Sequence, residues 1–150
     1  MEEDRTSKTA EAAALMRAAH LLIDGEPKIF EDRFALSFIG KEYENIIRET
    51  RDALGSPELT RLRSFIVMRS RFAEEQLEHA IQSNIKQYVI LGAGLDSFAY
   101  RRRDLADTVH IYEVDHPATQ QWKHGRLAEL GEDLPGNLTF VPVDFETQSL

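Results

Sequence analysis

A chain of 150 residues with a formal net charge of -8 and no cysteine excludes several classes of protein. The negative charge repels phosphate backbones, so nucleic acid is not an expected partner, and the missing cysteines exclude disulfides and zinc–thiolate sites. No apolar run approaches the ~20 residues of a membrane span and the acidic start does not resemble a signal peptide, so the sequence predicts a cytoplasmic protein with no membrane partner.

The part of the chain before residue 87 has the pattern of helices throughout. Capping and stop signals set the expected boundaries: Thr6 or Ser7 before the first helix, Gly40 after a short apolar turn, and Ser56 followed by Pro57 at the start of the last helix of this part. The expected segments are helices over 8–22, 42–54 and 57–82, with a short apolar turn over 32–38.

From Gln87 onward the pattern alternates between strand and helix. Strands are expected over 88–91, 109–114 and 138–143, with helices over 97–105 and 118–130. This alternation is typical of an α/β fold with a doubly wound parallel sheet.

The first expected strand runs directly into a glycine turn, Gly92-x-Gly94. Glycine lets the backbone turn sharply and approach a ligand that a Cβ would obstruct. Asp115 lies about 20 residues further on, where a βαβ unit presents a carboxylate to ribose hydroxyls. Ser97 replaces the third glycine of a dinucleotide fingerprint, which disfavours NAD and favours a ligand without phosphate, such as S-adenosylmethionine. The alternative is a glycine turn that binds no ligand.

Six motifs in order resemble the leucine carboxyl methyltransferase family, especially its bacterial branch. They are Thr9-Ala10-x-x-x-Ala14-x-x-Arg17-Ala18, Pro27-x-x-Phe30-x-Asp32-x-Phe34-Ala35, Arg69-x-Arg71-Phe72, Leu91-Gly92-Ala93-Gly94-Leu95-Asp96-Ser97-x-Ala99-Tyr100-Arg101, Glu113-Val114-Asp115-x-Pro117 and Val141-x-Val143-Asp144. The resemblance implies a helical N-terminal lid over residues 1–86, then the first three strands of a Rossmann-like methyltransferase sheet over 87–150. It also implies S-adenosyl-L-methionine as cofactor and methyl transfer to a carboxylate or hydroxyl oxygen.

Arg69 lies within an apolar stripe of the long helix, so we expect it to be buried and to need an anionic partner. The residues of this stripe are Leu62, Phe65, Ile66, Phe72, Ala73 and Ile81. The resemblance assigns Arg69 to the carboxylate of the cofactor's methionine moiety. The alternative is a protein carboxylate such as Asp32 or Asp96. Lys8 aligns loosely with a family lysine that reaches the same cofactor carboxylate, although an exposed lysine is the simpler expectation.

The resemblance places the cofactor's adenine beside Asp144 and Phe145, with Phe145 in place of the family's leucine. As an alternative, Asp144 merely caps a turn. Glu113 is the alternative to Asp115 as the ribose ligand, because both side chains point to the same face of one strand.

No catalytic residue can be named from the sequence, and the histidines show no metal-ligand spacing. On the helix after Pro117 we expect Trp122 to pack and Lys123 to be solvated. The run Arg101–Arg103 is expected to pair with acids such as Asp104 and Asp107.

Family relatives continue through four more strands, so the chain is expected to be either an N-terminal fragment or a short gene product that has lost catalysis. The alternative to a methyltransferase is a non-catalytic remnant that binds cofactor weakly or forms a homodimer through an open sheet edge. A nicotinamide-dependent oxidoreductase is a more distant alternative. The methyl acceptor, a small molecule or a protein carboxylate, cannot be identified from this sequence.

Overall fold

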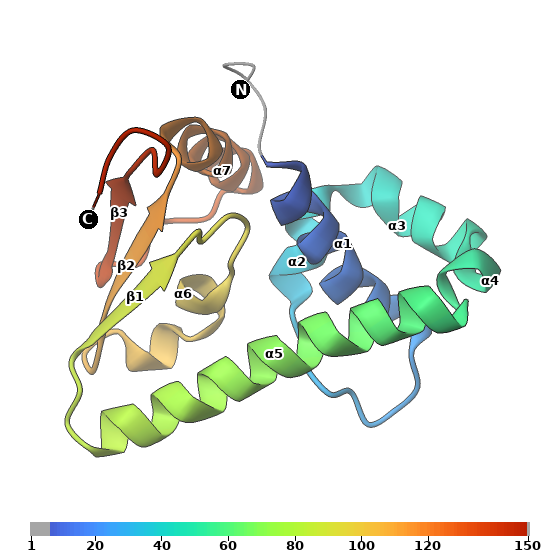
Figure 1. The fold of residues 1–150 in the computed structure, drawn as a ribbon, viewed down its shortest axis with the longest axis horizontal. Helices are drawn as coiled ribbons and strands as arrows, with labels where there is room; N and C mark the ends of the chain where they lie inside the picture. Colours follow the sequence, from blue (N-terminus) through green and yellow to red (C-terminus); the bar gives the residue numbers. More distant parts are fainter. Residues whose placement is uncertain (1–6, 150) are drawn as a thin grey trace.

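The computed structural model describes residues 7–149 and has two regions, a group of helices and a small parallel sheet (Figure 1). The helical region contains α1 (Lys8–Ile23), α2 (Arg33–Ile39), α3 (Lys41–Glu49), α4 (Arg51–Leu54) and α5 (Pro57–Gln82). The second region contains β1 (Gln87–Leu91), α6 (Phe98–Arg101), the 3-10 helix η1 (Arg103–Leu105), β2 (His110–Asp115), α7 (Pro117–Leu130) and β3 (Leu138–Pro142). The predicted α/β architecture is confirmed.

The three strands form one all-parallel sheet in the order β1-β2-β3. Tyr88 pairs with Ile111, and Ile111 pairs with Leu138, so these three side chains share the face that packs against the hydrophobic core. On the opposite face of β1, Val89 and Leu91 are 51% and 57% exposed. The sheet is therefore covered on one face, while the other face is open at β1 in the described residues.

The group α1 to α4 has its own small core. Three alanines, Ala18, Ala19 and Ala35, let α1 and α2 approach closely, and Ile47 and Leu54 close the cluster from α3 and α4. Figure 1 shows α5 running beneath this group and on toward the sheet. Within residues 7–149, no helix is apolar enough over sufficient length to span a membrane.

A second, larger core joins the helical group to the sheet. Ala14 of α1 and Phe38 of α2 pack with Leu77 of α5 and with Phe98 and Ile111 from the sheet region. Since buried side chains in close contact hold one arrangement, this core fixes how α1 and α2 lie against the loop that follows β1.

Two predicted helices differ from the observed ones. The segment expected over 42–54 is divided at Thr50, whose side-chain hydroxyl donates to the Ile46 carbonyl at 2.7 Å and whose backbone leaves the helical region. The segment expected over 97–105 is only α6 and η1, with a break at Arg102 (φ -110°, ψ 47°).

The buried face of α5 also differs from the predicted stripe. Leu62, Phe65 and Phe72 are 46%, 65% and 61% exposed, whereas Arg63 and Val67 are buried. Arg63 can be buried because its guanidinium donates two hydrogen bonds to the Asp24 carboxylate, at 2.8 and 2.7 Å. Hydrophobicity alone therefore predicted the buried face only in part, since Ile66 and Ile81 of the stripe do pack against the cores.

Candidate functional site

The glycine turn after β1 has the sharp backbone conformation that its sequence predicts. Gly92 and Gly94 have φ values of +64° and +52°, in the left-handed region that favours glycine. The amides of Gly92 and Ala93 both donate to the Val114 carbonyl, at 2.8 and 3.2 Å, which ties the turn to the end of β2.

The two glycines serve different purposes. A Cβ on Gly92 would meet nothing within 4 Å, so the chain leaves open space beside this exposed residue. A Cβ on Gly94 would lie 2.8 Å from the Ala10 side chain of α1. Gly94 therefore allows α1 to pack on the turn, whereas Gly92 faces open space.

Asp115 lies next to this turn at the end of β2, as predicted. Its carboxylate accepts hydrogen bonds from the amide of Gly94 and, at 2.6 Å, from the amide of His116. Because a carboxylate has about four acceptor sites, a half-buried Asp115 retains capacity for ligand hydroxyls.

Glu113 cannot replace Asp115 as a ligand group, because its side chain points into the core and is 1% exposed. The Lys123 ammonium lies 2.6 Å from its Oε2 atom and also donates to the Asp96 carbonyl at 2.6 Å. The expectation that Lys123 is solvated is therefore wrong. The sequence did contain a signal for this contact: Glu113 lies on the helix-covered face of the middle strand, β2, and a buried carboxylate needs a cation beside it.

Burial raises the pKa of Glu113 to about 7, although the Lys123 ammonium opposes this shift. The Oε1 atom of Glu113 is buried and has no hydrogen-bond partner within residues 7–149. The Glu113 carboxyl group is thus buried against Lys123 and becomes protonated as pH falls through about 7.

Stability is expected to depend on pH through Glu113. Its pKa is about 7 in the folded chain and 4.5 ordinarily, so between these values the folded state binds more protons than the unfolded state. Its stabilising contribution is present below the unfolded pKa and is lost as pH rises through about 7. Urea unfolding from pH 5 to 8 should show the wild type losing stability relative to Glu113→Gln. Parallel curves for the two proteins would contradict this assignment.

A second buried cation holds the neighbouring carbonyl of the turn. Arg17 of α1 donates to the Leu95 carbonyl at 2.7 Å and to the Asp32 carboxylate at 2.8 Å. Lys123 and Arg17 thus bind consecutive carbonyls, and each is held by a carboxylate. We call Arg17, Asp32, Glu113 and Lys123 the turn clamp. The sequence motifs contained Arg17 and Asp32, but their contact with each other was not predicted.

Arg69 does not occupy the buried position expected for it, because it lies on the exposed face of α5. It makes no ion pair in the described part of the chain, and Asp32 is bound to Arg17 instead. Its helix neighbours Ser70 and Glu74 line a cavity of about 40 Å³ together with Asp96 and Ser97 of the turn region. Arg69 itself does not line this cavity, and its contact with a ligand stays a prediction.

Asp144 and Phe145 follow β3 at the same edge of the sheet. The Val143 amide donates to the Asp115 carbonyl at 2.9 Å, which brings the ends of β2 and β3 together. Asp144 accepts hydrogen bonds from the Glu146 amide and the Thr147 hydroxyl, so it does cap a turn. Phe145 is 50% exposed and offers an aromatic surface. Their role toward adenine stays a prediction.

The arginine run after the turn is neutralised by the protein itself. Arg101 binds Glu74, Arg102 binds Glu78 and Asp104, and Arg103 binds Glu132. Pairing with Asp104 was predicted; pairing with Glu74, Glu78 and Glu132 was not, because those acids come from α5 and from the segment after α7. No cluster of metal-ligand side chains is found within residues 7–149.

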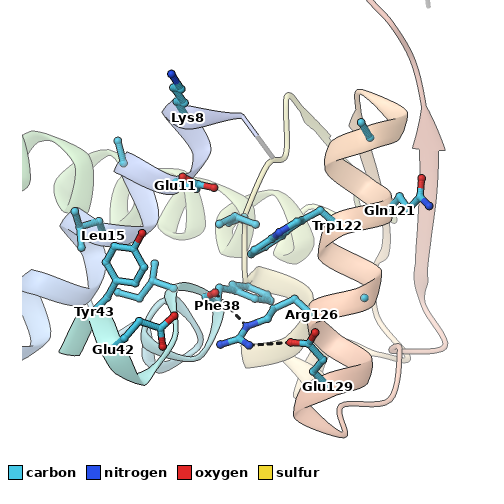
Figure 2. Close-up of a pocket in the computed structure, with 15 residues that line it drawn as sticks. Lys8, Glu11, Leu15, Phe38, Glu42, Tyr43, Gln121, Trp122, Arg126 and Glu129 are labelled. Atoms are coloured by element: carbon cyan, nitrogen blue, oxygen red, sulfur yellow. Dashed lines mark hydrogen bonds and ion pairs between the residues drawn. The ribbon is translucent and has the colours of Figure 1, made fainter. Parts of the chain in front are cut away.

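A groove of about 630 Å³ lies between α7 and the helices α1 to α3 (Figure 2). It reaches the turn at Leu95 and the start of α7 at Ala118. Trp122 was expected only to pack, and it also lines this groove. No sequence pattern predicted the groove, since its two walls come from distant segments.

The chain matches the model of the family described as leucine carboxyl methyltransferase over residues 10–150. It is 34% identical to "Putative S-adenosyl-L-methionine-dependent methyltransferase YktD" of Bacillus subtilis, covering 97% of this chain and 54% of that protein. A similarly named Mycobacterium avium protein is 27% identical, covering 95% of this chain and 50% of the relative. The chain thus spans about half the length of these relatives. Because the family match covers nearly the whole sequence, the chain belongs to the leucine carboxyl methyltransferase family.

Proposed function

We propose that this chain binds S-adenosyl-L-methionine along the carboxyl ends of its three strands and takes part in methyl transfer to oxygen. One observation carries the proposal: the open space at Gly92 lies on the same turn whose Gly94 amide bonds Asp115. A parallel sheet of this kind binds ligands outside the carboxyl ends of its strands. The donors and acceptors present fit a ribose and an adenine, and the family match supports the same ligand.

In this proposal each residue has a defined part in holding the cofactor. Asp115 accepts the ribose hydroxyls, Gly92 allows close approach of the ligand, and Gly94 orients the Asp115 carboxylate through its amide. Asp144 and Phe145 contact the adenine, while Arg69 turns toward the methionine carboxylate. The bound cofactor supplies a methyl group on a sulfonium, a good leaving group. The chain contributes alignment and exclusion of water, and alignment alone can lower a barrier by about 7 to 11 kcal/mol.

The same proposal covers the methyl acceptor, the cellular location and the oligomeric state. The acceptor oxygen belongs to a carboxylate or a hydroxyl, on a small molecule or on a protein, and the protein acts in the cytoplasm. A homodimer can form through the edge of β1, which has no neighbouring strand on one side within residues 7–149. The chain matches about half of its relatives' length, and we do not propose that it catalyses methyl transfer alone.

The test is the loss of cofactor binding in Asp115→Ala. S-adenosylhomocysteine should bind the wild type in a calorimetric titration and bind the variant at least tenfold more weakly, about 1.4 kcal/mol. Asp107→Ala is the matched control, because Asp107 is exposed and away from the turn. A thermal melt must show both variants folded. Unchanged affinity in folded Asp115→Ala would remove Asp115 from the site, and binding of NADH in place of S-adenosylhomocysteine would contradict the cofactor assignment.

A further inference from the structure

The groove between α7 and α1 to α3 has the size and the walls of a small-molecule site. Its volume of about 630 Å³ falls within the range of roughly 300 to 1,000 Å³ that drug-sized ligands occupy. Figure 2 shows Trp122 extending from α7 into the space facing α1, with Phe38 beneath it and Tyr43 on the opposite wall. Leu15 and Ile39 add aliphatic surface. These walls suit a ligand with a flat or apolar body.

More negatively than positively charged side chains line the groove. Three carboxylates line it, from Glu11, Glu42 and Glu129, against two cations, Lys8 and Arg126. Lys8 extends outward at the rim, away from the other labelled side chains (Figure 2).

Arg126 is not available to bind an anion. Its guanidinium donates to the Ser37 carbonyl at 2.8 Å, to the Phe38 carbonyl at 3.2 Å and to the Glu129 carboxylate at 2.9 Å. Glu11 and Glu42, by contrast, make no ion pair within residues 7–149. The groove therefore presents two uncompensated carboxylates beside aromatic rings.

We propose that this groove binds an amphipathic organic cation, with an apolar or aromatic body and one amine or quaternary ammonium group. The cation would lie between Glu11 and Glu42, where the rings of Tyr43 and Trp122 add cation–π attraction. An anionic ligand of the same shape would be repelled by the same carboxylates. The ligand would contact Leu95, directly after the glycine turn, but its binding does not require the cofactor.

Trp122 makes the test direct, because it is the single tryptophan of the chain. We would titrate the protein with three probes of one shape: phenethylamine as the cation, 2-phenylethanol as the neutral analogue and 3-phenylpropionate as the anion. The amine should give a saturable change in tryptophan emission, with affinity about tenfold above that of the alcohol and with the carboxylate weakest. Equal affinity for the amine and the carboxylate, or an emission change that does not saturate, would overturn the proposal.

Glu11→Gln and Glu42→Gln should each lower phenethylamine affinity by about threefold to tenfold and leave 2-phenylethanol binding unchanged. Glu58→Gln is the matched control, because Glu58 is exposed on α5 and does not line the groove. Amine affinity that is insensitive to both groove variants would contradict the assigned carboxylates. Calorimetry with S-adenosylhomocysteine separates the two proposals, since its binding without amine binding contradicts only the groove, and the reverse contradicts only the cofactor site.

Discussion

At pH 8, where Glu113 is mostly ionised, replacing Lys123 with methionine is expected to lower the free energy of unfolding by about 3 to 5 kcal/mol, the usual cost of removing one partner of a buried ion pair. Lys123 and Glu113 are each 1% exposed, and their atoms lie 2.6 Å apart. Methionine has a similar apolar stem but leaves the Glu113 carboxylate and the Asp96 carbonyl without a donor. The melting temperature should fall by roughly 10 °C, since each kcal/mol corresponds to about 2 to 4 °C in a domain of this size.

Two further variants show whether the lost stability comes from the unpaired charge. In Glu113→Leu combined with Lys123→Met, both charges are gone, and most of the lost stability should return because an apolar pair often matches a buried ion pair. Lys86→Met is the matched control for loss of one lysine, since Lys86 is exposed. If Lys123→Met melts within about 2 °C of the wild type, the pair does not hold the turn.

Local signals in the sequence predicted most of the fold. The capping serine and proline at 56–57 marked the start of α5, whose end at Gln82 was also predicted, and the apolar runs gave three parallel strands with small shifts at their ends. The buried face of α5 was predicted only in part, because it also depends on the ion pair of Arg63 with Asp24, which lies on a distant segment of the chain. Such a partner, distant in sequence, is not visible in hydrophobic periodicity.

The candidate site was likewise predictable from the sequence only in part. The proximity of the glycine turn and Asp115 was predictable, because parallel pairing brings the ends of β1 and β2 to one edge of the sheet. The turn clamp was not predictable, since Arg17, Asp32 and Lys123 come from segments distant from the turn they hold. The groove likewise requires α7 to face α1 and α3. Which residues touch the cofactor stays a prediction.

The Arg17–Asp32 pair of the turn clamp gives the second large effect on the free energy of unfolding. Asp32 is 1% exposed, binds Arg17 at 2.8 Å and caps α2 through the Ala35 amide at 3.0 Å. Asp32→Ala should therefore lose about 3 to 5 kcal/mol for the unpaired guanidinium and about 1 kcal/mol more for the cap. Asp32→Asn keeps an oxygen for the cap but loses the charge, so it should be more stable than Asp32→Ala by about 1 kcal/mol. Urea unfolding followed by Trp122 emission measures the stability of both variants, with Asp52→Ala as the exposed control on α4.

Since Arg17 also holds the Leu95 carbonyl, folded Asp32→Asn should bind S-adenosylhomocysteine more weakly than the Asp52→Ala control does. Wild-type stability in Asp32→Asn would mean that Arg17 finds another partner and that the clamp does not depend on this carboxylate.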